Sequence, residues 1–168
     1  YLLTLLTRTT MIVRPITDYY FINNNKHHQS IKPHLLNSMA VGNQDYIKLF
    51  SFFLNVELSK ILKKLNCEKQ ATGNISFKQY KKEDNTNLGK WESCLNFNYR
   101  NIYCVDTPNQ IMQIDLSNRL NKDLISLNIK EGDLLTFPST LAYRIPKDLT
   151  DNIKTIIFCD ASFEVYKD

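Results

Sequence analysis

The amino-acid sequence predicts an α+β fold that is mostly β, in which an N-terminal amphipathic helix packs on one sheet of a jelly roll. A helical pattern covers residues 45–66, and after Gly73 the chain changes to seven short strand-like runs separated by turn residues. A succession of short strands is typical of a sandwich or barrel. Because 168 residues is close to the usual size of one domain, we expect residues 1–168 to form a single domain with a jelly-roll core at 74–166.

The predicted main helix, residues 45–66, begins at Asp45, a residue type that favours the N-cap. Its apolar residues recur at spacings of three and four and therefore share one face: Ile47, Phe50, Leu54, Leu58, Ile61, Leu62 and Leu65. Four lysines lie late in or just after the helix, where cations stabilise its negative end: Lys60, Lys63, Lys64 and Lys69. We interpret them as a solvated face, in preference to an anion-binding patch.

Before this helix, the sequence predicts an edge strand followed by a turn. The apolar stretch 19–22 ends at a polar cluster, residues 23–29, and such clusters usually mark turns. Pro33 and Gly42 then bracket one or two helical turns over residues 34–41. Met11 is the first methionine, so residues 1–10 are interpreted as an upstream extension and receive no role.

The seven predicted strands cover residues 75–80, 94–106, 111–116, 124–129, 133–137, 142–145 and 154–165. Residues 74–80 alternate polar and apolar side chains, which is the period of a strand with one buried and one solvated face. Glu131, Gly132 and Asp133 form a tight turn, and the chain then enters an apolar run that ends at Phe137. This pattern of short strands and tight turns supports the jelly-roll prediction.

Charge, cysteine content and hydropathy argue against several function classes. The formal charge of +4 comes from scattered basic residues, so nucleic-acid binding is not indicated. The four cysteines include no CxxC pair, which argues against a zinc ribbon and a disulfide framework and favours reduced thiols: Cys67, Cys94, Cys104 and Cys159. No apolar run approaches the roughly 18 residues of a membrane helix. We therefore expect no membrane partner and an intracellular location, in the host cytoplasm or a virion if the chain is viral.

Two stretches of the sequence resemble a known family. Residues 127–138 read LNIKEGDLLTFP, and STLAYRIP at 139–146 and DNIKTIIF at 151–158 follow. This order is similar to the last strands of 2-oxoglutarate and Fe(II)-dependent oxygenases, especially small viral and bacterial members. Residues 77–105 resemble the segments around that family's first iron ligands, with matches at Gln79, Tyr80, Lys81, Trp91, Asn101, Ile102 and Tyr103. The resemblance covers roughly residues 77–163 and implies a double-stranded β-helix.

The resemblance implies an iron site of two histidines and one carboxylate, and this chain lacks that ligand set. The positions that match the first histidine and its partner hold Glu92 and Cys94, and the position that matches the distal histidine holds Tyr143. The histidines of the chain all lie near its start: His27, His28 and His34. No shift of register supplies a histidine after them, and a metal site among them is not favoured because adjacent side chains diverge.

In this family a basic residue on the final strand binds the distal carboxylate of 2-oxoglutarate. Lys154 is the nearest match, and Arg144 is a second candidate for binding this or another small anion. Because strand residues alternate between faces, we favour a solvent-facing Lys154 over an anion ligand. We expect Cys94 to be a small buried residue and not a nucleophile, since no histidine flanks it in the sequence.

The sequence leads to two main hypotheses of function. The favoured one is a catalytically degenerate, oxygenase-like jelly roll without a cofactor, a pseudoenzyme that acts as a binding or structural subunit. Its protein partner, or a second copy of the chain, would be recruited through exposed sheet edges. The abundance of Asn, Lys and Ile is similar to that in proteins of AT-rich viral genomes, phages among them, which favours a virion or phage-encoded accessory role.

The alternative hypothesis is a divergent but active 2-oxoglutarate-dependent dioxygenase, a hydroxylase. In that case Glu92, Cys94 and Tyr143 converge on Fe(II), and Lys154 or Arg144 reaches the same pocket to hold 2-oxoglutarate. A third hypothesis is an anion-binding module that keeps Lys154 and has lost the metal.

Overall fold

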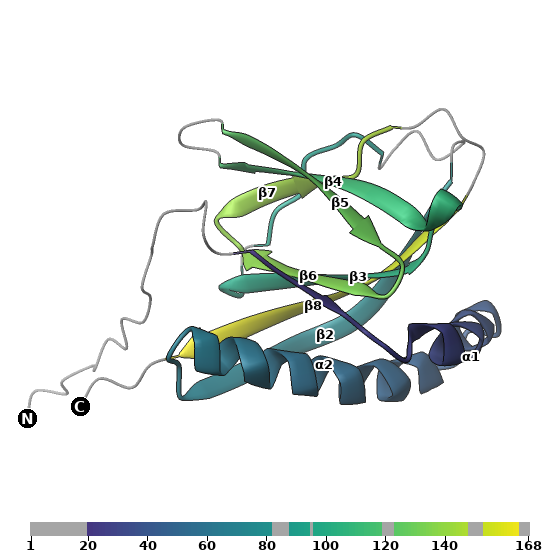
Figure 1. The fold of residues 1–168 in the computed structure, drawn as a ribbon, viewed down its shortest axis with the longest axis horizontal. Helices are drawn as coiled ribbons and strands as arrows, with labels where there is room; N and C mark the ends of the chain where they lie inside the picture. The colour runs from purple at the N-terminus through teal and green to yellow at the C-terminus, as the bar shows by residue number, and fades with distance from the viewer. Residues whose placement is uncertain (1–19, 82–87, 95, 119–122, 148–152, 165–168) are drawn as a thin grey trace, which may run out of the picture.

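The computed structural model describes residues 20–81, 88–94, 96–118, 123–147 and 153–164. Within them, two antiparallel sheets face each other and two helices cover the outer face of the larger sheet (Figure 1). This arrangement confirms the predicted α+β, mostly β, jelly roll with a helix packed on one sheet. The proposed extension at 1–10 and the last predicted core residues, 165–166, lie outside the described residues.

The larger sheet has five strands in the order β1-β6-β3-β8-β2. In this order the strands are Phe21–Asn24, Asp133–Pro138, Tyr99–Asp106, Lys154–Glu164 and Lys69–Tyr80. All four neighbouring pairs are antiparallel. One edge is formed by β1, with 4 residues, and the other by β2, with 12, so β2 presents much the longer edge.

The smaller sheet has three strands in the order β5-β4-β7, which are Leu124–Lys130, Ile111–Asn118 and Leu141–Arg144. A short 3-10 turn, Pro108–Gln110, connects β3 of the larger sheet to β4 of the smaller one. Beside β7, an isolated bridge joins Glu92 to Tyr143. This bridge attaches the segment before β3 to the smaller sheet.

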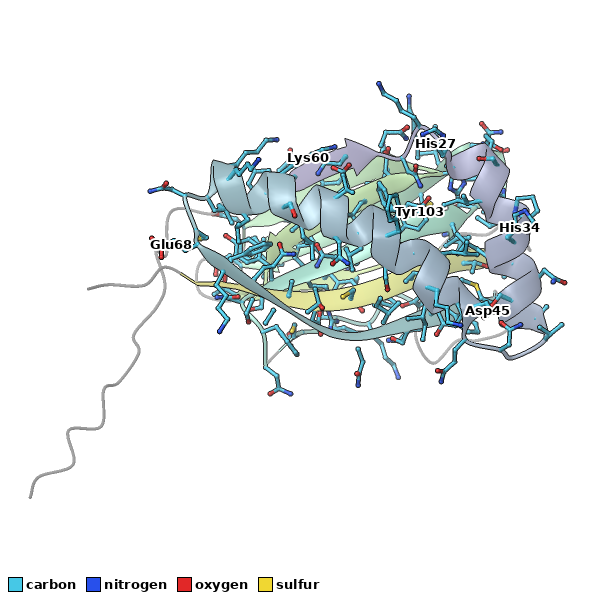
Figure 2. All side chains as sticks on the ribbon, turned by 90° about the horizontal axis from the view of Figure 1, so that it is seen from below. His27, His34, Asp45, Lys60, Glu68 and Tyr103 are labelled. Atoms are coloured by element: carbon cyan, nitrogen blue, oxygen red, sulfur yellow. The ribbon has the colours of Figure 1, made fainter. Side chains whose placement is uncertain are left out.

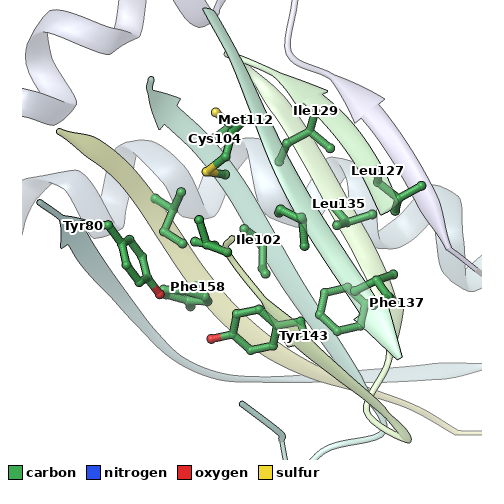
Figure 3. Close-up of a cluster of buried hydrophobic side chains, with 14 of the residues drawn as sticks. Tyr80, Ile102, Cys104, Met112, Leu127, Ile129, Leu135, Phe137, Tyr143 and Phe158 are labelled. Atoms are coloured by element: carbon green, nitrogen blue, oxygen red, sulfur yellow. The ribbon is translucent and has the colours of Figure 1, made fainter. Parts of the chain in front are cut away.

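The alternation of side chains along β8 divides the core into two layers. Ile156 and Phe158 point between the two sheets, whereas Ile157 and Cys159 pack on the helix side. Figure 3 shows the cluster between the sheets, which includes Tyr80, Ile102, Cys104, Met112, Leu127, Ile129, Leu135, Phe137, Tyr143 and Phe158. Both faces of β8 are therefore covered.

The main helix, α2, spans Asp45–Lys64 and ends two residues before the predicted bound. Its buried face includes the predicted apolar residues Phe50, Leu54, Leu58 and Ile61. The prediction that Asp45 is the N-cap is wrong: Gln44 occupies that position, and the Asp45 N–H donates to Asn43 Oδ1 at 3.0 Å. The four lysines at the end of the helix and just beyond it are exposed, as expected of a solvated face.

The other helix, α1, spans His28–Ala40 and is longer than predicted. The sequence indicated a turn up to residue 29 and a helix only from residue 34, because Pro33 is typical of a helix start. In the structure Pro33 lies inside the helix. Burial of His28, Leu35 and Met39 against the sheet outweighs the hydrogen bond that a proline removes. No helix in the described part of the chain is both long and apolar enough to cross a membrane.

Two predicted strands also change their bounds. The first begins at Lys69 and not at residue 75, because its pairing with β8 continues across an irregularity between Thr72 and Ile75. The strand predicted from residue 94 begins at Tyr99. The intervening segment leaves the sheet, so Glu92 and Cys94 are held by a loop.

Candidate functional site

Two of the three residues at the predicted ligand positions, Glu92 and Tyr143, lie side by side at β7. Tyr143 belongs to the cluster between the sheets, and two backbone hydrogen bonds fix Glu92 beside it. The Glu92 N–H donates to the Tyr143 carbonyl at 2.8 Å, and the Tyr143 N–H donates to the Glu92 carbonyl at 2.9 Å. Glu92 and Tyr143 are therefore adjacent, whereas the alternative hypothesis requires Cys94 to converge on the same point as well.

Two donors of the chain occupy one oxygen of the Glu92 carboxylate. Glu92 Oε2 accepts hydrogen bonds from Tyr143 Oη and Lys78 Nζ, both at 2.7 Å. Lys78 comes from β2 and also lies over the Phe158 ring, 5.1 Å from its centroid. The carboxylate is thus both charge-paired and hydrogen-bonded by the chain itself.

Two buried phenols meet next to this carboxylate. The hydroxyls of Tyr80 and Tyr143 point toward each other (Figure 3). Burial raises the pKa of Tyr143, and nearby Tyr80 and Glu92 raise this pKa further. Burial and the Glu92 charge also raise the pKa of Tyr80, and the neighbouring Tyr143 hydroxyl only partly opposes this shift. Both phenols therefore stay neutral.

Cys94 is buried, as expected, with 7% of its surface exposed. Its Sγ donates a weak hydrogen bond to the Phe97 carbonyl at 3.9 Å. Burial raises the pKa of its thiol, and the carboxylate of Asp160 raises it further. Because the thiolate is the form that binds metals and attacks electrophiles, this environment favours neither role.

Sequence reasoning missed Arg100, the cation at the centre of this group. Its Nε and Nη2 donate to the two carboxylate oxygens of Asp160 at 2.7 and 3.0 Å, and its guanidinium lies 5.2 Å from the Tyr143 ring centroid. Burial opposes the charge, but the Asp160 contact holds the pKa of Arg100 above its ordinary value. The sequence did contain a signal for this role: because side chains two apart on a strand share a face, Arg100 lies on the same face as the apolar residues Ile102 and Cys104.

Lys154 is buried, so the prediction that it faces solvent is wrong. Only 6% of its surface is exposed. It shares a strand face with Ile156 and Phe158 and pairs with Tyr80 across the β2–β8 register, which places it between the two sheets. The physical reason is that the smaller sheet covers one face of β8 and the helices cover the other.

Arg144 lies on the opposite face of β7 from Tyr143. Its Nε donates to Asp115 Oδ2 at 2.8 Å, and its guanidinium lies over the Trp91 ring, 4.7 Å from the centroid. The expectation that Arg144 reaches the same pocket as the ligand positions is therefore wrong. Of the two anion candidates, only Lys154 faces the space between the sheets.

The histidines of the chain are separated from this group by the larger sheet. His28 is buried on the helix side, where its Nδ1 lies 2.8 Å from Tyr103 Oη. His27, at the start of α1, and His34, within it, are both exposed and lie apart from each other (Figure 2). Among the described residues, no three His, Cys, Asp or Glu side chains form a group that could hold a metal ion.

The donors present do not fit the iron site that the resemblance implies. A non-haem Fe(II) centre of this type uses two neutral imidazoles and one carboxylate with open positions. Here the donors are a thiol and a phenol with raised pKa values and a carboxylate already bonded to Lys78. The Arg100 guanidinium against Tyr143 adds a positive charge that disfavours a metal cation.

No family model and no curated protein matches this sequence. Solved structures match in fold. The viral collagen prolyl hydroxylase of Paramecium bursaria Chlorella virus-1, in complex with 2OG, aligns with a TM-score of 0.58 and 12% identity over 86% of this chain and 96% of that chain. A truncated form of the same enzyme aligns with a TM-score of 0.55 and 12% identity over 95% of this chain and 97% of that chain. The chain therefore has the double-stranded β-helix fold of these oxygenases.

Proposed function

We propose that this chain uses the oxygenase fold without catalysis, as a binding or structural subunit. The observation that carries the proposal is the pairing of two partly buried carboxylates near Tyr143 with cations of the chain: Glu92 with Lys78, and Asp160 with Arg100. A guanidinium that grips both oxygens of a carboxylate is a stable substitute for a bound metal cation. These ion pairs support a structural role for this part of the fold.

The surface feature that suits a binding role is the outer edge of β2, which pairs with no other strand in the described part of the chain. This strand contributes 12 residues to the end of the larger sheet, and an open edge can pair with a strand of another chain. A second copy of this chain is the simplest occupant, because two identical edges related by a twofold axis can pair in antiparallel fashion. The viral or phage origin proposed for such a subunit rests on the Asn-, Lys- and Ile-rich composition.

The absence of catalysis can be tested by following 2-oxoglutarate consumption in the presence of Fe(II), ascorbate and dioxygen. We expect the wild-type chain and Glu92→Ala to consume no more 2-oxoglutarate than a blank without protein. Iron-dependent turnover that disappears in Glu92→Ala would establish the divergent dioxygenase instead. Asp45→Ala, on the exposed start of α2, is the matched carboxylate control.

The burial of Lys154 between the sheets favours a second candidate function, the binding of a small dicarboxylate without metal. Calorimetric titration with 2-oxoglutarate alone tests it. Saturable binding to the wild type that is lost in Lys154→Ala would support this function, provided that Lys60→Ala, an exposed control, still binds. An equal absence of heat in all three proteins would reject it.

A further inference from the structure

An open pocket of about 440 Å³ lies beside β7, outside the group formed by Glu92 and Tyr143. Six residues line it: Leu88, Gly89, Lys90, Arg144, Pro146 and Lys147. They come from two segments that the backbone holds together, since the Gly89 N–H donates to the Ile145 carbonyl at 2.8 Å. This hydrogen bond joins the two segments that line the pocket at the border of the smaller sheet.

The lining of this pocket is strongly cationic. Lys90 and Lys147 are exposed, and neither forms an ion pair with a described residue. The third cation, Arg144, has one carboxylate partner, Asp115. Among the described residues around the pocket, three positive charges against one negative charge leave two net positive charges, which match a dianion.

Arg144 is held in place before any ligand arrives. Its Nε donates a hydrogen bond to Asp115, and its guanidinium carbon lies over the Trp91 ring, 4.7 Å from the centroid, in a cation–π contact. Asp115 is fixed in turn, because Gln113 and Ser126 donate to its Oδ1 at 2.9 and 2.7 Å. Burial opposes ionisation, but these hydrogen bonds and Arg144 lower the pKa of Asp115, so the anchor stays charged.

The remaining donors of Arg144 are therefore available. Its Nη groups donate to no other side chain in the described part of the chain. A pre-positioned guanidinium loses little freedom when it binds an oxyanion in two places. Gly89 contributes to the same geometry: its φ is +78°, and a Cβ there would lie 3.3 Å from Lys147 Cγ, so the lysine stem can cross the turn.

We propose that this pocket binds a phosphate group, most tightly as the monoester of a small molecule. Arg144 grips two phosphate oxygens, Lys90 and Lys147 neutralise the remaining charge, and Trp91 positions the guanidinium. The volume exceeds that of one phosphate, which leaves room for the esterified group. This site shares no residue with the paired carboxylates, so its test is independent of the proposed function.

Trp91 is the only tryptophan of the chain and lies against Arg144, so its fluorescence reports on changes at this guanidinium. The experiment is a titration of the full chain with inorganic phosphate and with AMP at constant ionic strength, followed by tryptophan fluorescence and calorimetry. We expect saturation with both, tighter for AMP, and dissociation constants about tenfold higher in Lys147→Ala and Arg144→Lys. Lys63→Ala, an exposed lysine on α2, should bind like the wild type.

The relative affinities for phosphate and AMP distinguish free phosphate from a phosphate ester as the ligand of this pocket. Equal affinity for phosphate and AMP would assign the pocket to free phosphate, and tighter AMP binding would assign it to a phosphate ester. No saturable response to either probe would overturn the proposal. Equal weakening in Lys63→Ala and Lys147→Ala would also overturn it, because that result indicates binding by net charge alone.

Discussion

At the scale of single residues, the stability of this region depends on which side chain neutralises each carboxylate. Asp160 faces Arg100 directly across the β3–β8 register, and the two side chains form a bidentate pair that is mostly shielded from solvent. Glu92 accepts from Lys78 and Tyr143. A charge left behind without its partner in such a place is costly, because the surroundings solvate it poorly.

Replacement of Arg100 by Met should destabilise the chain by about 3 kcal/mol, because Asp160 is then left unpaired. The double variant Arg100→Met, Asp160→Leu should recover most of this loss, since both charges are removed together. Urea unfolding of the wild type, both single variants and the double variant gives the coupling energy. Additive single effects would show that the two side chains do not stabilise each other.

His28 provides a pH-dependent prediction at the same scale. Burial lowers its pKa below the ordinary value of 6.5; the Glu131 carboxylate opposes this shift and Lys32 adds to it. The unfolded chain therefore binds a proton here more readily than the folded chain. This contribution to stability is complete above about pH 6.5 and is lost as the pH falls below that value.

We expect the melting temperature of the wild type to fall more steeply below about pH 6.5 than that of His28→Asn. His27→Asn is the matched control, because its imidazole is adjacent in sequence but exposed. The measurement is thermal unfolding across this pH range for the three proteins. Identical slopes for His28→Asn and the wild type would show that His28 does not couple protonation to folding.

At the scale of elements, the periodic patterns in the sequence correctly predicted which helices and strands form, but not the residues at which some of them begin. The spacing in residues 45–66 predicted α2, and the turn at Glu131 and Gly132 predicted the start of β6. The start of α1 at His28 was missed, because what stabilises its first turn is burial of the His28 ring against Tyr103, a contact distant in sequence. The early start of β2 was missed since its polar residues pair with β8 without an apolar period.

Two phenylalanines of α2 test the assignment of its faces. Phe50 is fully buried, whereas Phe52 is 80% exposed. Phe50→Ala should cost about 3–5 kcal/mol of unfolding free energy through the cavity it leaves, and Phe52→Ala should stay within about 0.5 kcal/mol of the wild type. Chemical denaturation of the wild type and the two variants measures these free energies of unfolding. Similar losses would mean that α2 packs with a different face.

At the scale of the whole molecule, the sequence resemblance predicted the fold and two of the residues that meet inside it. Glu92 and Tyr143 could be matched by motif, because each lies in a stretch with the family's pattern. Lys78 and Arg100 could not, since their roles depend on which strands become neighbours. Lys154 was wrongly predicted to face solvent, because the burial of both faces of β8 depends on how the smaller sheet and the helices pack on this strand.

The edge of β2 gives a prediction about assembly. Asn74 lies where the register with β8 shifts, so a proline there should spare the internal ladder while blocking pairing with another chain. We expect sedimentation velocity to show a dimer for the wild type and Asn74→Ala and a monomer for Asn74→Pro, with similar melting temperatures. A monomeric wild type would exclude self-pairing through this edge.

The central claim of the proposed function is that Lys78 and Arg100 satisfy the carboxylates of Glu92 and Asp160, so that these carboxylates bind no metal. The most direct measurement is anaerobic calorimetric titration of the metal-stripped chain with Fe(II) and Mn(II), comparing the wild type with Glu92→Ala. The account predicts no saturable heat for either protein. Saturable one-site binding to the wild type that is abolished in Glu92→Ala would contradict it and establish a metal centre in this fold.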